Sequence, residues 1–213
     1  CRLGAKDPDG AIAVARRAVA AGQDNDMAWF NLANALAEKG RTDPKAREES
    51  HAAYEKALTL DPRQVDVYQS YASLLATERR ADDARALLER ARKAGVRDPD
   101  LETELGLLEV ARKAPDAARA SFLRAIALNP NLSEAHRWLG VVYWHIGLFE
   151  KAIEQFRETG AIDPGNRHAQ SAPAHVLTYQ GRYEEALRTT REVPPEGNPA
   201  MRTYLVAWDL LCL

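Results

Sequence analysis

The sequence has few large apolar residues for its length. Leu, Val, Ile and Phe occur 24, 11, 5 and 4 times among 213 residues, about 21% of the chain, just above the range where chains fail to fold. Ala, by contrast, occurs 38 times, and the formal net charge is only −2. Because charge does not favour disorder, this composition indicates helices that pack closely through small side chains.

Cysteine, excess charge and long apolar runs are also scarce. The two cysteines, Cys1 and Cys212, stand at opposite ends of the sequence, which excludes a disulfide scaffold. No charge-free run reaches the roughly 18 residues that a membrane helix needs, so we expect no membrane span. The 29 basic and 31 acidic residues balance, and this balance argues against nucleic acid as a partner because phosphate binding needs a basic surface.

The chain begins with Cys1 rather than Met. We expect a fragment of a longer protein, because both ends fall inside a repeat unit. A mature lipoprotein anchored through Cys1 is the alternative. A cytoplasmic location is favoured, since few cysteines suit a reducing compartment.

A repeat of 34 residues runs through the sequence, as expected for stacked helical units. Small or nearly small residues occupy one column at Ser50, Ala84, Ala118, Ala152 and Ala186, and a second at Ala33, Ala72, Gly106, Gly140 and Ala174. Larger residues occupy a third column at Tyr54, Leu88, Phe122 and Phe156, with Thr190 as the exception.

Each column has a physical explanation in a pair of antiparallel helices. Small residues let the two backbones approach where the helices cross, and the large residues fill the space beside the crossing. Pro62, Pro130 and Pro164 end the second helix of their units, because proline cannot continue the hydrogen-bond ladder. Gly40, Gly147 and Gly181 lie in the turn between two helices, where we expect positive φ angles; all of these positions follow the repeat.

The repeat resembles the tetratricopeptide repeat family. Residues Trp138-Leu139-Gly140-Val141-Val142-Tyr143, followed by Gly147, Ala152, Phe156 and Pro164, carry the best match, and a second begins at Trp29. The resemblance implies an all-α fold, a right-handed α-solenoid (superhelix) of antiparallel helix pairs. We expect one domain over residues 1–213 with five complete repeats and a partial repeat at each end: 1–25, 26–64, 65–98, 99–132, 133–166, 167–199 and 200–213.

Three departures from the repeat carry structural predictions. The repeat 26–64 is five residues too long, and Asp43-Pro44 predicts a second helix that starts about one turn early. Gly95 predicts a helix end, with a restart at Asp98-Pro99. Pro173 falls inside an expected first helix and predicts a late or kinked start.

The sequence carries no known catalytic motif, so we expect no enzyme activity. P-loop, dinucleotide-binding, zinc-protease and nucleophile-elbow patterns are all absent from the sequence. His145, His168 and His175 fall on one expected face, but no histidine pair has the i, i+4 spacing of a helical zinc site. We therefore expect no metal site and no cofactor.

The resemblance places the inner-face residues of the first helices along a concave groove. Aromatic and cationic types, which supply much of the energy at interfaces, gather in the C-terminal half. The predicted peptide-binding groove comprises Arg137, Trp138, Val141, Trp144, His145, His168, His175 and Tyr179. Acidic residues, Asp66, Asp100 and Glu104, gather in the N-terminal half. The alternative for Trp138 and Trp144 is a purely structural role against the neighbouring repeat.

These features predict a non-catalytic protein–protein interaction scaffold that binds a peptide segment of a partner protein. The alternative is a regulatory or substrate-presenting segment of a larger enzyme, a transferase or a kinase. A third expectation is end-to-end self-association through the apolar stripe around Tyr204-Leu205-Val206 and Leu210-Leu211.

Overall fold

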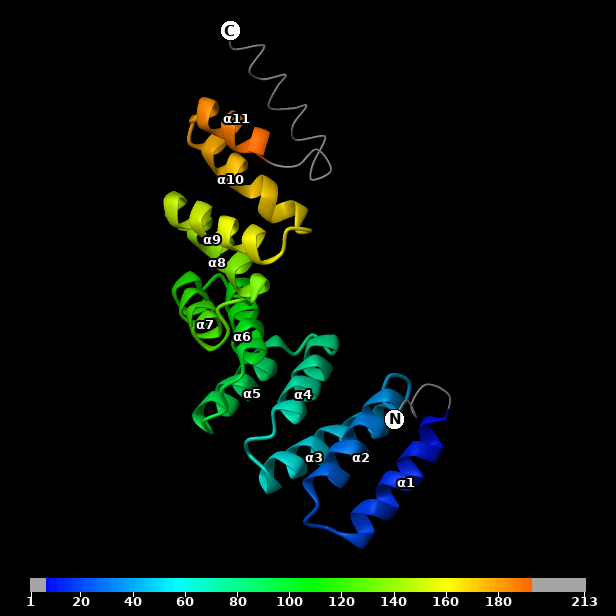
Figure 1. Ribbon diagram of the computed structural model, residues 1–213. Coiled ribbons are helices and arrows are strands. Elements are labelled where there is room, and N and C mark those ends of the chain that lie inside the picture. Colours follow the sequence, from blue (N-terminus) through cyan, green and yellow to red (C-terminus); the bar gives the residue numbers. More distant parts are fainter. Residues whose placement is uncertain (1–6, 193–213) are drawn as a thin grey trace. The chain divides into compact units, whose positions relative to one another are not determined.

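The computed structural model describes residues 7–192, and within this range it contains eleven α-helices and no strand (Figure 1). The predicted all-α solenoid of antiparallel helix pairs is confirmed as a fold class. The chain forms two compact units, unit 1 (Cys1–Arg97) and unit 2 (Asp98–Leu213). The predicted C-terminal association segment and Cys1 lie outside the described residues.

Unit 1 contains α1 (Pro8–Ala21), α2 (Asp26–Lys39), α3 (Pro44–Leu60), α4 (Val65–Thr77) and α5 (Ala81–Lys93). Each helix contacts the next one along the chain. Three helices begin at a side chain that accepts a backbone N–H, which satisfies donors that have no partner inside the helix. The acceptors are Asp7 for α1, Asn25 for α2 and Asp43 for α3.

Unit 2 contains α6 (Pro99–Ala111), α7 (Pro115–Leu128), α8 (Ser133–His145), α9 (Phe149–Ile162), α10 (Arg167–Tyr179) and α11 (Tyr183–Glu192). The first helices α6, α8 and α10 alternate with the second helices α7, α9 and α11, and α6 also contacts α8. One core cluster includes Phe122, Leu139, Phe156 and Leu177. The first helices are therefore held in place by the second helices on which they pack.

The small and large columns meet in this core. A Cβ atom added to Gly106 would lie 2.6 Å from the Phe122 ring, and one added to Gly140 would lie 2.8 Å from the Phe156 ring. Both rings are buried. Because carbon atoms cannot approach so closely, glycine is required wherever the large column supplies phenylalanine. The close helix approach predicted from the columns is confirmed at these two crossings.

Four turns between paired helices share one backbone geometry. Arg79, Lys113, Gly147 and Gly181 follow one another at intervals of 34 residues, and their φ angles are 60°, 58°, 79° and 75°. The prediction of a positive φ was correct for Gly147 and Gly181. It was wrong for Gly40, whose φ is −60°.

The turn at Gly40 differs because α3 starts early. Asp43 caps α3 by accepting the N–H of Lys45 at 2.9 Å, and Pro44 is the first helical residue, so the predicted early start is confirmed. This added turn brings Arg47 against the end of α2, and a Cβ on Gly40 would lie 2.9 Å from the Arg47 Cα. Gly40 is therefore needed for space rather than for its φ angle.

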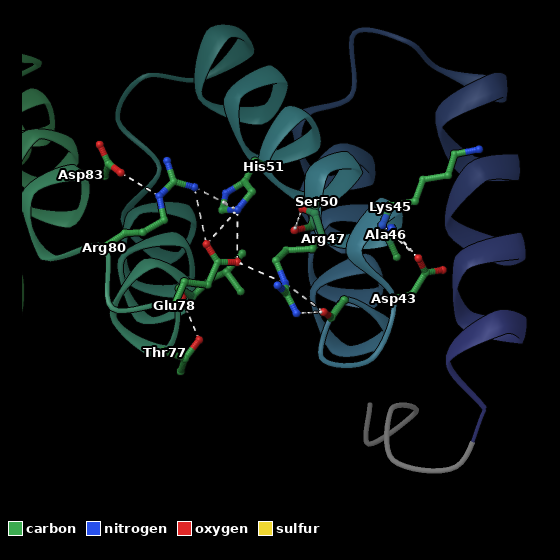
Figure 2. A network of polar contacts seen from close by, with 12 residues as sticks. Asp43, Lys45, Ala46, Arg47, Ser50, His51, Thr77, Glu78, Arg80 and Asp83 are labelled. Atoms are coloured by element: carbon green, nitrogen blue, oxygen red, sulfur yellow. Dashed lines mark hydrogen bonds and ion pairs between the residues drawn. The ribbon is translucent and has the colours of Figure 1, made fainter.

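The same early turn joins a polar network in unit 1 (Figure 2). Arg47 donates to the Gly40 carbonyl oxygen through Nε at 3.0 Å and Nη2 at 2.7 Å. The Glu78 carboxylate, at the end of α4, lies 3.0 Å from His51 Nε2 and 3.5 Å from Arg80 Nη1. Glu78 thus connects α3 to the α4–α5 turn.

The linkers that follow α3, α7 and α9 share a short polar pattern. Each helix ends one residue before Asp61, Asn129 or Asp163, and a proline comes next, which confirms the predicted role of proline. The side-chain oxygen of each Asp or Asn accepts the N–H two residues later, at 2.9 to 3.1 Å. This local bond stabilises the turn that proline begins.

A side chain on the following first helix then bonds back to the linker. The donor lies six residues after the carbonyl that it contacts: Trp29 Nε1 to Gln23 O (2.8 Å), Tyr68 Oη to Pro62 O (3.1 Å), His136 Nε2 to Pro130 O (3.0 Å) and Gln170 Nε2 to Pro164 O. Glu102 occupies the equivalent position at the start of unit 2, where a carboxylate cannot donate. It accepts instead from Arg124 Nε at 2.9 Å.

Two further departures have different outcomes. Asp98 caps α6 by accepting the N–H of Leu101 at 2.9 Å, and Gly95 has a φ of 83° beyond the end of α5, so both predictions there are confirmed. The predicted late start at Pro173 is wrong. The helix α10 begins at Arg167 and continues through Pro173, because the Asn166 side chain caps it by accepting the Ala169 N–H at 3.1 Å.

Candidate functional site

The candidate site lies on two first helices of unit 2. The helix α8 carries Arg137, Trp138, Val141, Trp144 and His145, and α10 carries His168, His175 and Tyr179. We call these eight residues the α8–α10 face. The three histidines are exposed and Tyr179 is 71% exposed, whereas the other four residues are half-buried.

Arg137 and Trp138 form a stacked pair at the centre of α8. The guanidinium carbon of Arg137 lies 4.4 Å from the centre of the Trp138 ring, and Arg137 Nη2 lies 3.5 Å from a carboxylate oxygen of Glu134. A cation over an indole ring is stabilised by about 0.5–1 kcal/mol at exposed sites. This stack fixes the guanidinium plane beside the ring.

Trp138, Val141 and Trp144 also pack against the core cluster of unit 2. Part of each side chain therefore stabilises the fold, as the structural alternative for the tryptophans proposes. The Trp138 indole N–H is buried, and no acceptor for it lies among the residues described. A buried donor without a partner is uncommon in folded proteins.

His145 stands at the last turn of α8 beside Trp144. Its Nδ1 lies 2.8 Å from the Val141 carbonyl oxygen, and because a carbonyl only accepts, Nδ1 carries the hydrogen. The imidazole and indole rings are tilted, with centres 6.0 Å apart. The other ring nitrogen, Nε2, is the second polar atom of this exposed side chain.

The α10 residues form the second half of the face. Partial desolvation lowers the pKa of His175, and the neighbouring His168 lowers it further. At neutral pH the imidazole of His175 is therefore held in its uncharged form. Tyr179 lies at the end of the same helix, with its ring centre 5.7 Å from that of Phe149.

Phe149 was not predicted as part of the site. It is the first residue of α9, packs against the same core cluster as Trp144, and supports the Tyr179 ring. Its place in the repeat gave a weak signal, because Tyr183 follows it after 34 residues. The importance of Phe149 comes from the packing of α9 beside α10.

Other functional features are few in the part of the chain that the structure describes. None of the described helices combines the length and the apolar character that a membrane span requires. The same residues contain no group of three or more His, Cys, Asp or Glu side chains that could hold a metal ion.

The fold and this face define a helical-repeat protein built from paired antiparallel helices. The family model for the tetratricopeptide repeat matches residues 2–43 and 103–167, just over half of the chain. The chain belongs to the tetratricopeptide repeat family. Such repeats are scaffolds for protein–protein interaction, and proteins of this fold are typically non-catalytic interaction modules.

Two curated relatives are much longer than this chain. Protein O-mannosyl-transferase TMTC1 of Homo sapiens is 30% identical over 66 residues, which are 31% of this chain and 8% of the relative. Superkiller protein 3 of Schizosaccharomyces pombe is 24% identical over 147 residues, 66% of this chain and 11% of the relative. The chain therefore matches about a tenth of the length of these relatives.

Solved structures share the fold. YrrB, described as a tetratricopeptide repeat protein with an unusual peptide-binding site, is 24% identical with a TM-score of 0.72 over 91% of this chain and 98% of that chain. MamA is 26% identical with a TM-score of 0.64 over 74% and 91%. Pseudomonas aeruginosa pilF is 17% identical with a TM-score of 0.66 over 94% and 89%.

Proposed function

We propose that this chain is a non-catalytic scaffold that binds a peptide segment of a partner protein on the α8–α10 face, within a concave groove. The observation that carries the proposal is Tyr179, a large aromatic side chain that is 71% exposed although its ring has a supporting contact with Phe149. Aromatic and arginine side chains are the types that contribute most binding energy at interfaces.

The same face is suited to binding because part of it is rigid. Trp138, Val141 and Trp144 are anchored by the core cluster, and the Arg137 guanidinium is held by the Trp138 ring and Glu134. Side chains that are already ordered lose little conformational entropy when a ligand binds. The exposed histidines and Tyr179 then provide polar and aromatic contacts beside these anchors. The description of a peptide-binding site in YrrB, a protein of the same fold, agrees with this proposal.

A library of linear peptides selected against the chain tests the proposal. We expect selected peptides to bind Tyr179→Ala at least about 30-fold more weakly than the wild type, because truncating a hot-spot residue costs about 2 kcal/mol or more. Isothermal titration calorimetry measures the affinities, and circular dichroism checks the helicity. Tyr179→Ala suits this test better than Trp144→Ala, because Trp144 also packs against the core.

Leu123→Ala is the matched control, because Leu123 is a large side chain of α7 that is 45% exposed and lies on a second helix. It should leave peptide affinity unchanged. Equal affinities for the wild type, Tyr179→Ala and Leu123→Ala would contradict the α8–α10 face as the binding surface.

A second candidate function is a regulatory or substrate-presenting segment of a larger enzyme. It is favoured by one observation, the match to a short part of a much longer protein named as a transferase. Sequencing the complete gene tests this candidate. A catalytic domain in the same open reading frame would support it, and repeats alone would contradict it.

We also propose that nucleic acid is not a partner, because the chain has no excess of basic residues. Retention of the chain on a duplex DNA or RNA column at physiological salt would contradict this. End-to-end self-association stays a prediction, and a molar mass that rises with concentration in light scattering would support it.

A further inference from the structure

Glu104 is a partly buried carboxylate on the first helix of unit 2. It lies in α6, is intermediate in exposure, and has neither a cation nor a hydrogen-bond donor as a partner among residues 7–192. Burial raises the pKa of Glu104 above its usual value of 4.5, because the charged form is partly removed from water. The ionised side chain therefore opposes folding at neutral pH.

Other acidic residues of the same helix show that unit 2 can supply partners. Glu102 is buried, and its carboxylate accepts from Arg124 Nε at 2.9 Å. Glu109 is also buried and has an interaction. The two buried carboxylates of α6 thus have interaction partners, whereas Glu104 has none among the described residues. A charged group that lowers stability and has no structural partner is a candidate for ligand binding.

Glu104 shares its repeat position with Trp138, which follows after 34 residues. The helices α6 and α8 contact each other, and the axes of packed helices lie about 8–10 Å apart. Trp138 contributes the second unsatisfied group, an indole N–H without an acceptor among the described residues. One acceptor and one donor without partners therefore lie at the same repeat position.

The charges around this position favour a cationic ligand. Asp100 is exposed one turn before Glu104 on α6, and Glu134 lies 34 residues after Asp100, on α8. Arg137 is directed to Glu134 and the Trp138 ring. The surroundings of Glu104 are thus acidic, which repels phosphates and carboxylates and attracts an ammonium or guanidinium group.

We propose that Glu104 and Trp138 form a subsite for a Lys or Arg side chain of the bound peptide. The carboxylate of Glu104 pairs with the ligand cation, beside the half-buried Trp138 indole at the equivalent position of α8. This inference rests on the proposed function and adds the chemistry of the partner: a segment with a basic residue at the α6 end and groups that contact Tyr179 and the histidines at the α10 end.

Peptide selection with charge variants tests the subsite. A random library of linear 12-residue peptides is selected in parallel against the full chain carrying Glu104, Glu104→Gln or Glu104→Lys. We expect Lys and Arg to be enriched at one position with the wild type, the enrichment to be lost with Glu104→Gln, and acidic residues to be enriched there with Glu104→Lys. A selected peptide should bind Glu104→Gln about 10-fold more weakly, the effect of one lost charge-assisted hydrogen bond.

Unfolding in urea provides an independent readout. Because the ionised carboxylate opposes folding, Glu104→Gln should unfold at a higher midpoint urea concentration than the wild type at pH 7, and the difference should shrink below pH 4.5. Glu158→Gln, an exposed position on the second helix α9, is the matched control and should change neither stability nor selection. A lower midpoint for Glu104→Gln would overturn the inference, because it would reveal a structural role.

Two results separate this inference from the proposed function. If selected peptides depend on Tyr179 but show no basic preference, or bind Glu104→Gln as tightly as the wild type, the subsite is wrong and the binding face stands. If no peptide is enriched, or enriched peptides ignore Tyr179→Ala, the proposed function itself fails.

Discussion

Single residues of unit 1 show how burial sets the pH range of the fold. The rings of Tyr54 and Tyr71 are stacked with centres 4.9 Å apart and planes 10° apart, and both are buried. The Tyr54 hydroxyl donates to Asn34 Oδ1 at 2.6 Å. Burial raises the pKa of Tyr71 from 10.0 to about 12, and burial also raises the pKa of Tyr54.

These shifts predict alkaline destabilisation. Below pH 10 both tyrosines are neutral in the folded and unfolded states; above it only the unfolded chain ionises readily, so stability falls as pH rises from 10 to about 12. Tyr71→Phe keeps the ring and removes one ionisation, so it should lose about 1 kcal/mol less stability than the wild type between pH 9 and pH 11. Urea unfolding at both pH values measures this, and parallel losses in the two proteins would contradict it.

Single residues also show what the repeat pattern can and cannot predict. Arg79 and Lys113 adopt positive φ angles like those of Gly147 and Gly181, although arginine and lysine do not by themselves predict a positive φ. The signal was their spacing rather than their identity, because the turn geometry is imposed by the two helices that it joins. Gly40 is the opposite case, since the five extra residues replace the shared turn by a contact with Arg47.

At the scale of elements, the sizes of paired residues across each crossing are matched. Gly106 and Gly140 face Phe122 and Phe156, whereas the equivalent pairs in unit 1 are Ala72 with Leu88 and Ala33 with Tyr54. From Ala72 to Gly140 the small residue shrinks to glycine where the large residue is phenylalanine, and Ala33 with Tyr54 departs from this match. This explains why the columns predicted the helix pairs so well: each column reports one side of a single packing contact.

The size match predicts a compensating pair of substitutions. Gly140→Ala should lower the free energy of unfolding by about 1–3 kcal/mol, because the new methyl group overlaps the Phe156 ring. Gly140→Ala combined with Phe156→Leu recreates the Ala72–Leu88 pair. In the Phe156→Leu background, Gly140→Ala should therefore lower the free energy of unfolding by less than it does in the wild type. A double-mutant cycle in urea measures the coupling. Strictly additive effects would show that the two positions do not share this contact.

Tertiary contacts account for the features that the sequence could not predict. Pro173 was expected to delay or kink α10, but the local Asn166 cap starts the helix six residues before it. The 34-residue repeat assigned the candidate residues to α8 and α10. It could not decide whether Trp138 and Trp144 belong to the core or to the surface, because a half-buried indole contributes to both. Whether Glu104 has a partner is likewise decided by side chains from other helices.

At the scale of the whole molecule, the chain divides its features between two compact units. Unit 1 contains the stacked tyrosines and the Glu78 network, both of which stabilise helix packing. Unit 2 contains the exposed Tyr179, the Arg137–Trp138 stack and Glu104, which has no partner among the described residues. This distribution places the proposed peptide contacts on unit 2.

Hydrogen–deuterium exchange of the chain, with and without a library-selected peptide, tests this central claim most directly. Backbone amides of α8 and α10 should become protected by the peptide, those of α1 to α5 should exchange as before, and Tyr179→Ala should abolish the protection at the same peptide concentration. Protection confined to unit 1, or to the second helices α7, α9 and α11, would contradict the assignment of the binding surface to the α8–α10 face.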